Sequence, residues 1–190
     1  MTCCWGFIPS LRRLASAVIT GTFTSNKAIY RGAPPPTPIA VAIGKIHSHG
    51  FEFDSICRIT QRLQLLANYS WIGAKFGGGI DLKGNGFGST PKYSGSAWAM
   101  YEAPLALPGK LRLGGGLVYV GRRFGDDANS FKVPGYLRTD LSAHYQIDKL
   151  DLRLKVENLL DKRYVSSSIY DDTVIQGNRL LFQFLAGVRF

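Results

Sequence analysis

Polar and apolar side chains alternate along most of this chain, and this period of two restricts its fold more than any other feature. The clearest case runs from Leu150 to Glu157, where Leu and Val alternate with Asp, Arg, Lys and Glu. A helix would spread these charges around its surface, whereas the pleat of a strand sends all of them to one face. The segment is therefore predicted to be a strand with one apolar and one charged face.

Other segments show the same alternation. Residues 137–147 and 180–190 follow it closely, and residues 49–59, 62–76, 92–103 and 110–124 follow it with exceptions. Val118 and Val120 interrupt one polar face, and Trp98 shares a face with Lys92. The sequence predicts an all-β, antiparallel up-and-down meander of seven strands, or eight if Pro38 to Ile43 forms another.

The connections between these strands alternate in length. Short turns are expected at 59–61, 104–109 and 147–149, and long loops at 77–91, 125–134 and 165–178. In a meander, all the short turns then lie at one end of the sheet and all the long loops at the other. Outer-membrane barrels have this asymmetry, with short periplasmic turns and long extracellular loops.

The charges fix which face of such a barrel meets lipid. If the strand from Leu150 to Glu157 were reversed, Arg153 and Lys155 would face lipid at a cost of up to about 2–4 kcal/mol each near the midplane. These two side chains are therefore expected to face the lumen.

Charge and composition restrict the class of protein further. There are 23 Lys and Arg against 13 Asp and Glu, a net charge of +10, but only Arg12-Arg13 and Arg122-Arg123 are adjacent basic pairs. No basic patch typical of a nucleic-acid binder is present. No apolar run approaches the roughly 18–20 residues of a membrane-spanning helix. The three cysteines have no zinc-binding spacing. Neither nucleic acid nor a helical membrane anchor is predicted.

Three stretches resemble one protein family. They are Gly121 to Tyr136 (GRRFGDDANSFKVPGY), Val156 to Tyr164 (VENLLDKRY) and the closing strand that ends in Phe190. They resemble the C-terminal barrel of TonB-dependent outer-membrane receptors, in particular the siderophore-receptor branch. The segment His49 to Asp54 is similar to the family's repeated Arg-Gly-Xaa-Glu strand opening, with His49 in the place of Arg.

The resemblance implies part of a larger barrel in the outer membrane. Members of this family form 22-stranded barrels closed by an N-terminal plug with a TonB-contacting box, and they import ferric siderophores. Seven or eight strands are about a third of such a barrel, and no plug or TonB box is recognisable here. We expect a C-terminal fragment that does not transport by itself.

Two regions are expected on this basis. Residues 38–190 form the C-terminal part of the receptor barrel, and residues 1–37 form an atypical tail. Pro34-Pro35-Pro36 breaks regular structure in this tail, and the run from Leu14 to Ile19 is too short for a secretory signal. Disorder, out-of-frame sequence and fusion sequence are the explanations that the sequence offers for this tail.

The resemblance also implies partners. These are outer-membrane lipid, a ferric siderophore in the full-length receptor, the TonB complex through the plug only, and the barrel-assembly machinery through the strand ending in Phe190. With the long loops outside, Arg138, Arg153 and Lys155 would help to attract an anionic ferric chelate. Residues that contact the ligand are not assigned, because missing strands and the plug would share these contacts.

No catalytic, cofactor or metal site is predicted. His47 and His49 share one strand face but lack a third ligand at a suitable spacing. The glycine-rich stretches lack the following Lys-Ser/Thr of a phosphate loop, and no Gly-Xaa-Ser-Xaa-Gly elbow occurs. The pair Asp126-Asp127 is expected to solvate its loop rather than to bind a cation. We do not expect an enzyme.

Two alternatives remain open on the sequence. One is a small autonomous eight-stranded outer-membrane barrel, filled by side chains and acting as an anchor or adhesin. The other is a soluble β-barrel that binds a ligand at a basic rim.

Overall fold

The computed structural model describes residues 23–30, 40–77, 81–106, 108–169 and 173–189, with the backbone alone for 23–30, 40–44 and 169. Every regular element in these ranges is a β-strand. Within them, no helix has the length and apolar character needed to cross a membrane.

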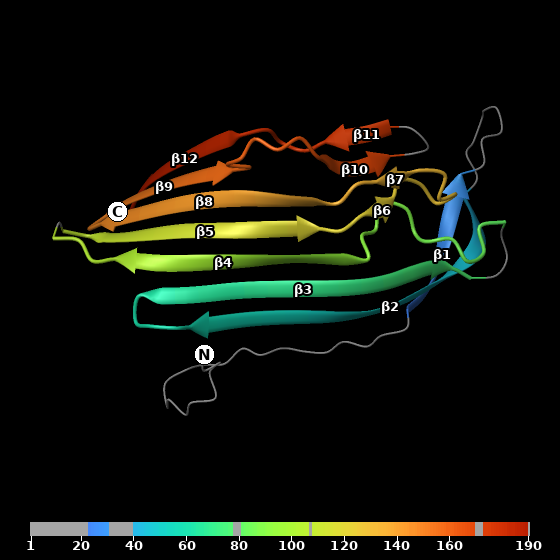
Figure 1. Cartoon of the computed structure of the whole chain (residues 1–190), viewed down its shortest axis with the longest axis horizontal. Helices are drawn as coiled ribbons and strands as arrows, with labels where there is room; N and C mark the ends of the chain where they lie inside the picture. The colour runs from blue at the N-terminus through green and yellow to red at the C-terminus, as the bar shows by residue number, and fades with distance from the viewer. Residues whose placement is uncertain (1–22, 31–39, 78–80, 107, 170–172, 190) are drawn as a thin grey trace, which may run out of the picture.

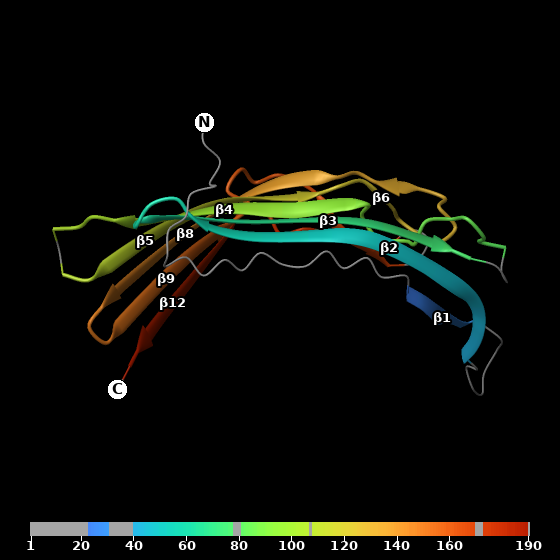
Figure 2. The ribbon, with the colours of Figure 1, turned by 90° about the horizontal axis from the view of Figure 1, so that it is seen from below.

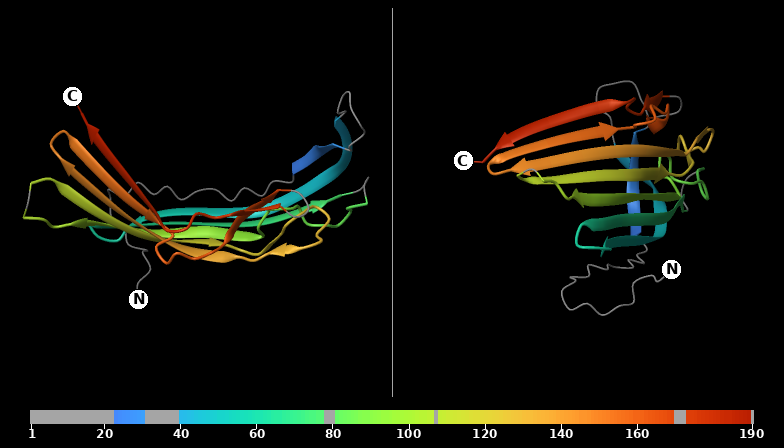
Figure 3. Two further views of the ribbon diagram at one scale, coloured as in Figure 1. Left: turned by 90° about the horizontal axis from the view of Figure 1, so that it is seen from above. Right: turned by 60° about the vertical axis from the view of Figure 1, so that its left-hand side comes forward.

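Eight strands form one antiparallel sheet in the order β1-β2-β3-β4-β5-β8-β9-β12 (Figure 1). Their bounds are β1 Phe23–Tyr30, β2 Ala40–Arg58, β3 Leu63–Phe76, β4 Tyr93–Ala103, β5 Lys110–Val120, β8 Tyr136–Ile147, β9 Leu150–Glu157 and β12 Leu181–Val188. β1 and β12 are the two edges, and the sheet between them curves like part of a barrel wall (Figures 2 and 3). The predicted meander is confirmed.

Two small hairpins interrupt the meander. β6 (Arg123–Phe124) pairs with β7 (Lys132–Val133), and β10 (Val165–Ile169) pairs with β11 (Thr173–Gln176). Both hairpins lie at the long-loop end of the sheet, whereas the short turns lie at the other end with the C-terminus (Figure 1). The predicted asymmetry of turn lengths is therefore present, and two of the long loops carry β-structure of their own.

Three predicted boundaries differ from the structure. Residues 40–43 and 49–58 belong to one strand, β2, so the described part of the segment 38–43 is not a separate eighth strand; residues 38 and 39 lie outside the described residues. The eighth strand is β1, which lies inside the predicted tail 1–37 and pairs with the first half of β2. The segment 110–124 divides, because β5 ends at Val120 and the next residues form β6. The remainder of the tail and Phe190 lie outside the described residues.

One face of the sheet is apolar from β2 to β12. The register carries it across the strands through the pairs Phe53–Tyr69, Leu65–Ala99, Tyr101–Leu113, Tyr119–Leu137, Leu141–Val156 and Phe184–Leu154. Most side chains of this face are exposed, Phe184 by 68% and Leu117 by 46%, whereas Val156 is 8% exposed. A continuous apolar surface of this extent is typical of a wall that faces lipid.

Aromatic side chains flank this apolar face at both ends. Trp71, Tyr93 and Tyr119 lie on it toward the long loops, and Tyr101 and Tyr145 lie toward the short turns. Tyr93 and Tyr101 are eight residues apart on β4, which is about 26 Å of strand. This spacing is close to the roughly 25 Å apolar band between the two aromatic girdles of membrane barrels.

The opposite face carries the charged side chains of the sheet, together with some large apolar ones, among them Ile56, Leu66 and Trp98, which are neighbours in the register. Trp98 lies over Gly116 of the neighbouring strand: a Cβ at Gly116 would come within 2.4 Å of the Trp98 ring. Gly116, in the run of glycines that interrupts the alternation in the sequence, therefore makes room for an indole on the lumen side, and a Cβ at Gly114 would lie 3.7 Å from the same ring.

Candidate functional site

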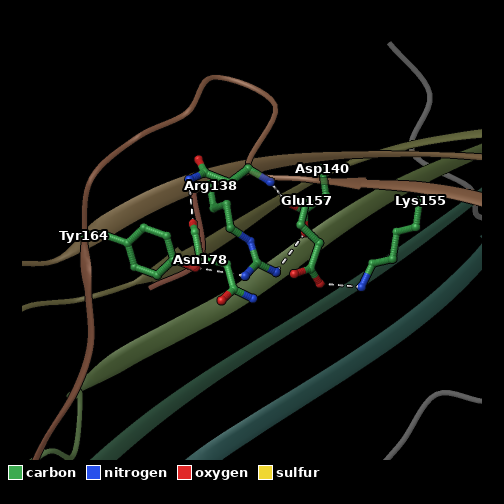
Figure 4. A network of polar contacts seen from close by, with 7 residues as sticks. Arg138, Asp140, Lys155, Glu157, Tyr164 and Asn178 are labelled. Carbon is green, nitrogen blue, oxygen red and sulfur yellow. Dashed lines mark hydrogen bonds and ion pairs between the residues drawn. The ribbon is translucent and has the colours of Figure 1, made fainter. Parts of the chain in front are cut away.

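A cluster of paired charges occupies the polar face where β8 and β9 approach the long loops (Figure 4). Arg138 donates to Oδ2 of Asp140 at 2.8 Å and to the hydroxyl of Tyr164 at 3.2 Å. Asp140 is 1% exposed, so its charge is satisfied inside the wall. On β9, Lys155 donates to Glu157 at 2.5 Å. This cluster holds the loop residue Tyr164 against the sheet.

Asn158 forms the corner at which the chain leaves β9. Its side-chain amide donates to the carbonyl oxygens of Lys162 and Asn178 at 2.8 Å each, and its Oδ1 accepts from the N–H of Lys162 at 2.9 Å. Its φ is +54°, in the left-handed region that Asn tolerates better than most residues. The Val156 to Tyr164 motif thus encodes a turn that fixes the loop after β9.

A second polar cluster lies nearer the short turns. Asp151 on β9 accepts from Nε of Arg153 at 2.7 Å and lies 3.0 Å from Nε2 of His144 on β8. Together with the first cluster, it pairs each of the three cations expected to attract an anionic chelate: Arg138 with Asp140, Arg153 with Asp151, and Lys155 with Glu157. Their expected effect on a ligand stays a prediction, but their charges are largely offset.

The three long loops are joined to one another. The hydroxyls of Ser89 and Ser168 lie 2.7 Å apart, and Ser168 also donates to the carbonyl oxygen of Gly125. Asn129 exchanges two hydrogen bonds of 2.8 Å with the backbone of Gly86. Loops that are far apart in the sequence therefore form one cluster above the sheet.

The acidic pair in this cluster is structural. Asp126 is 6% exposed and accepts from the N–H and hydroxyl of Ser130 at 2.8 and 2.5 Å. Asp127 accepts from the N–H of Gly88 at 3.0 Å. The expectation that this pair solvates its loop is therefore wrong for Asp126, which is buried; Asp127 is half-buried and also holds a backbone group of the loop cluster. Asp171-Asp172, an acidic pair for which the sequence gives the same expectation, lies outside the described residues.

Arg123 of β6 ties the cluster to the β10–β11 hairpin. It is 5% exposed and donates to the carbonyl oxygens of Val165 and Ser166 at 2.9 and 2.8 Å. Burial lowers its pKa. Two guanidinium nitrogens in this region, Nη1 of Arg123 and Nε of Arg138, are buried without a hydrogen-bond acceptor among the described residues.

A cavity of about 510 Å³ opens beside the first cluster. Tyr136 and Tyr164 line it with ring centroids 4.2 Å apart, and three basic residues, Lys162, Arg163 and Arg179, also line it. No acidic side chain lines it, although Asp161 pairs with Arg179 at its edge. Lys162 and Arg163 were not identified from the sequence as candidate ligand-binding residues, although both lie in the motif Val156 to Tyr164 that carries the family resemblance.

The histidine pair is part of the sheet. His49 lies across from Gly73 and packs edge-on against Trp71, with ring centroids 5.3 Å apart, and His47 lies across from Lys75. No group of three His, Cys, Asp or Glu side chains suited to a metal ion occurs in the described ranges.

The curved, two-faced sheet with its joined loops allows a comparison with known proteins. The family model "TonB dependent receptor-like, beta-barrel" matches residues 15–159. The chain belongs to this family. Receptors of this family are outer-membrane proteins and transporters, not enzymes. The outer-membrane location therefore rules out the soluble ligand binder. The match begins inside the predicted tail 1–37, whose origin stays a prediction.

Two curated relatives show how much of a receptor this chain matches. The ferrioxamine receptor of Yersinia enterocolitica is 31% identical over 166 residues, which are 83% of this chain and 22% of the relative. The ferrichrome outer membrane transporter/phage receptor of Escherichia coli K12 is 31% identical over 171 residues, which are 85% of this chain and 22% of the relative. The chain therefore spans about a fifth of the length of these relatives.

Solved structures agree with this assignment. The siderophore receptor PiuA from Acinetobacter baumannii aligns with a TM-score of 0.65 and 26% identity, over 80% of this chain and 23% of that protein. The ferric yersiniabactin uptake receptor FyuA from Yersinia pestis aligns with a TM-score of 0.71 and 18% identity, over 80% and 25%, which supports the fold.

Proposed function

We propose that this chain supplies the C-terminal wall of an outer-membrane receptor for TonB-dependent uptake of ferric siderophores, and that it does not transport by itself. The observation that carries the proposal is the open, two-faced sheet: one face is apolar and exposed, the other carries buried ion pairs, and the edges β1 and β12 are not hydrogen-bonded to each other. In membranes every strand needs a partner on both sides, so a sheet with two edges requires further strands.

The orientation follows from the loops. We place the long-loop cluster outside the cell and the short turns in the periplasm, as in other outer-membrane barrels. The polar face then lines the lumen, where the plug of a complete receptor sits. TonB contacts in this arrangement belong to the plug and not to this sheet.

The cavity between Tyr136 and Arg179 is the candidate for ligand contact. Two adjacent tyrosine rings give an apolar surface, and Lys162 and Arg163 add positive charge that no ion pair among the described residues offsets. Lys162 and Arg163 are exposed, and cations that line a cavity raise the local concentration of an anionic ligand. This arrangement favours a negatively charged ferric chelate over an uncharged one.

A binding experiment tests the ligand proposal. The chain, folded in detergent, is titrated with an iron tris-catecholate and with ferrichrome, an uncharged ferric hydroxamate, while its tryptophan fluorescence is followed. We expect the catecholate to bind more tightly, and the double variant Lys162→Gln/Arg163→Gln to weaken it by about tenfold, since two cations are removed. The matched control is Lys110→Gln/Lys149→Gln at the short-turn end. Equal binding by the two double variants would overturn the role of the cavity.

Native mass and gel mobility distinguish two hypotheses: that the chain is one sector of a larger barrel, and that it closes into a small barrel of its own. A closed eight-stranded monomer runs at different apparent masses before and after heating in dodecyl sulfate. We expect the isolated chain to show no heat-modifiable monomer, because β1 and β12 do not pair. A compact, heat-modifiable monomer would establish the autonomous barrel instead.

A further inference from the structure

Cations are distributed unequally over the two faces of the sheet. In the described strands of the sheet, Lys45 and Lys75 are the cations in register with the apolar face, and both lie beyond Trp71 toward the long loops. The other strand cations, among them Lys110, Arg112 and Arg153, lie on the polar face. Positive charge on the outer face is thus confined to one end of the wall.

Three more exposed cations lie at the same end of the wall, outside the strands of the sheet. Lys92 precedes β4 at a position that alternation assigns to the polar face, but its Nζ lies 5.5 Å from the centroid of the ring of Tyr93, which is on the apolar face. Lys132 alternates with the buried Val133 on β7, and its Nζ lies 5.9 Å from the centroid of the Phe124 ring. Arg122 is exposed beside the buried Arg123. We call Lys75, Lys92, Arg122 and Lys132 the outer collar.

The outer collar surrounds a hollow at the edge of the apolar face. The hollow has a volume of about 1020 Å³, and the four collar residues line it together with Trp71, Tyr93 and Tyr119. No acidic residue lines it. The salt bridges of the described residues include none of the four collar cations. The hollow therefore combines unpaired positive charge with the aromatic girdle directly below it.

We propose that the outer collar binds the phosphate groups of anionic lipids in the leaflet that surrounds the barrel. The collar follows the apolar face at the level where acyl chains give way to headgroups. There its cations meet lipid phosphates, and each basic residue near an anionic membrane surface strengthens binding by roughly fivefold. The rings of Trp71 and Tyr93 give the acyl chains of the same lipid a surface. A free phosphate would use only the charges, so lipid is the occupant that the whole hollow fits.

This inference rests on the outer-membrane location of the family and not on the siderophore proposal. Tyr136 and Lys162 line both the hollow and the smaller cavity, but no residue of the outer collar lines the smaller cavity. A chain that binds no ferric chelate would still be expected to hold lipid at the collar. The two proposals therefore fail independently.

The test measures lipid retention by the full chain folded in detergent. The chain is incubated with lipid A, a phosphorylated glycolipid, separated by gel filtration and assayed for bound phosphorus. We expect the variant Lys75→Gln/Lys92→Gln/Arg122→Gln/Lys132→Gln to need at least about tenfold more lipid A for half-saturation than the unaltered chain. The matched control removes four cations from the other end: Arg58→Gln/Arg62→Gln/Lys110→Gln/Lys149→Gln.

Each outcome decides the proposal. Loss of retention in the collar variant but not in the control supports it, and equal retention by both overturns it. Inorganic phosphate and phosphatidylcholine are run in parallel: competition by inorganic phosphate at the lipid A concentration, or equal retention of zwitterionic lipid, would also overturn it. If the fourfold variant does not fold, the single variants Lys75→Gln and Lys132→Gln are measured against Lys110→Gln by the same criterion.

Discussion

The backbone N–H of Asn158 donates a 2.9 Å hydrogen bond to Oδ1 of Asp140, which joins the corner after β9 to the middle of β8. Asn158 is 0% exposed and Asp140 is 1% exposed. Because Asp140 also accepts from Arg138, one carboxylate links the loop corner to the lumen wall. The position of the candidate cavity depends on this link.

Replacing Asn158 should destabilise the wall. Asn158→Ala removes three side-chain hydrogen bonds and leaves a non-Asn residue at positive φ. We expect the free energy of unfolding to fall by about 3 kcal/mol, since each buried group left unsatisfied costs about 1–3 kcal/mol. Urea unfolding in detergent, followed by tryptophan fluorescence, measures the change. Asn68→Ala, which removes exposed hydrogen bonds to Ser96, is the control and should cost less than about 1 kcal/mol. Similar losses in both variants would contradict the role of the corner.

Gly116 should not accept a side chain. A Cβ at this position would lie 2.4 Å from the Trp98 ring, whereas a Cβ at Gly187 would meet its nearest atom at 3.9 Å. We expect Gly116→Ala to lower the free energy of unfolding by about 1–3 kcal/mol through overpacking, and Gly187→Ala to change it little. The double variant Gly116→Ala/Trp98→Ala relieves the clash, so the cost of Gly116→Ala should largely disappear in that background. If Gly116→Ala lowers the free energy of unfolding as much in the Trp98→Ala background as in the unaltered chain, a clash with Trp98 is not the cause of the loss.

The two faces of β8 should respond oppositely to a charge. Leu141 lies on the apolar face and Ser142 on the polar face. We expect Leu141→Arg to lower the share of the chain that resists alkaline extraction from membranes, because an arginine facing lipid near the midplane costs about 2–4 kcal/mol. Ser142→Arg is the matched control, one residue away, and should be retained like the unaltered chain. Equal retention of the two variants would mean that neither face meets lipid.

The sheet could be predicted from the sequence because the backbone of a strand sends successive side chains to opposite faces, and polar and apolar residues alternate accordingly. Residues 137–147 and 150–157 were located nearly to the residue, since a period of two has one structural explanation when charges fill every other position. The same alternation predicted which residues of these strands lie on the apolar face and which lie on the polar face. β1 was not predicted, because its sequence FTSNKAIY alternates poorly and precedes a proline-rich stretch.

The loops and the candidate site could not be predicted in the same way. Asp126 and Asp127 are adjacent acidic residues, a pattern that usually indicates a solvated loop, and only the fold brings the backbone of Gly88 to one of them. Likewise, Arg153 and Lys155 were identified as lumen-facing, but the ion pairs that offset their charges depend on strand register and rotamers. Contacts of this kind have no signature in a single sequence.

The carboxyl group of Asp161 should titrate far below its usual range. Hydrogen bonds from the guanidinium of Arg179, with a further one from the N–H of Leu180, lower the pKa of Asp161 to about 2. Because this pKa lies below the value of about 3.9 in an unfolded chain, the pair stabilises the loop above pH 4, and this contribution is lost as the pH falls through 2. We expect the amide of Leu180 to stay protected from hydrogen exchange down to about pH 3, and to lose this protection at all pH values in Asp161→Ala, which removes the acceptor oxygen. Loss of protection near pH 4 in the unaltered chain would contradict the pairing.

The most direct test of the account is a cysteine scan along β8 in membranes. Single cysteines are placed at each position from Leu137 to Gln146 in a chain whose native cysteines are replaced, labelled with a fluorophore and exposed to a lipid-soluble quencher. The account predicts quenching with a period of two, strong at Leu137, Leu141 and Ala143 and weak at Ser142 and His144. Uniform quenching along the strand, or none, would contradict the central claim that this sheet is a wall between lipid and a polar lumen.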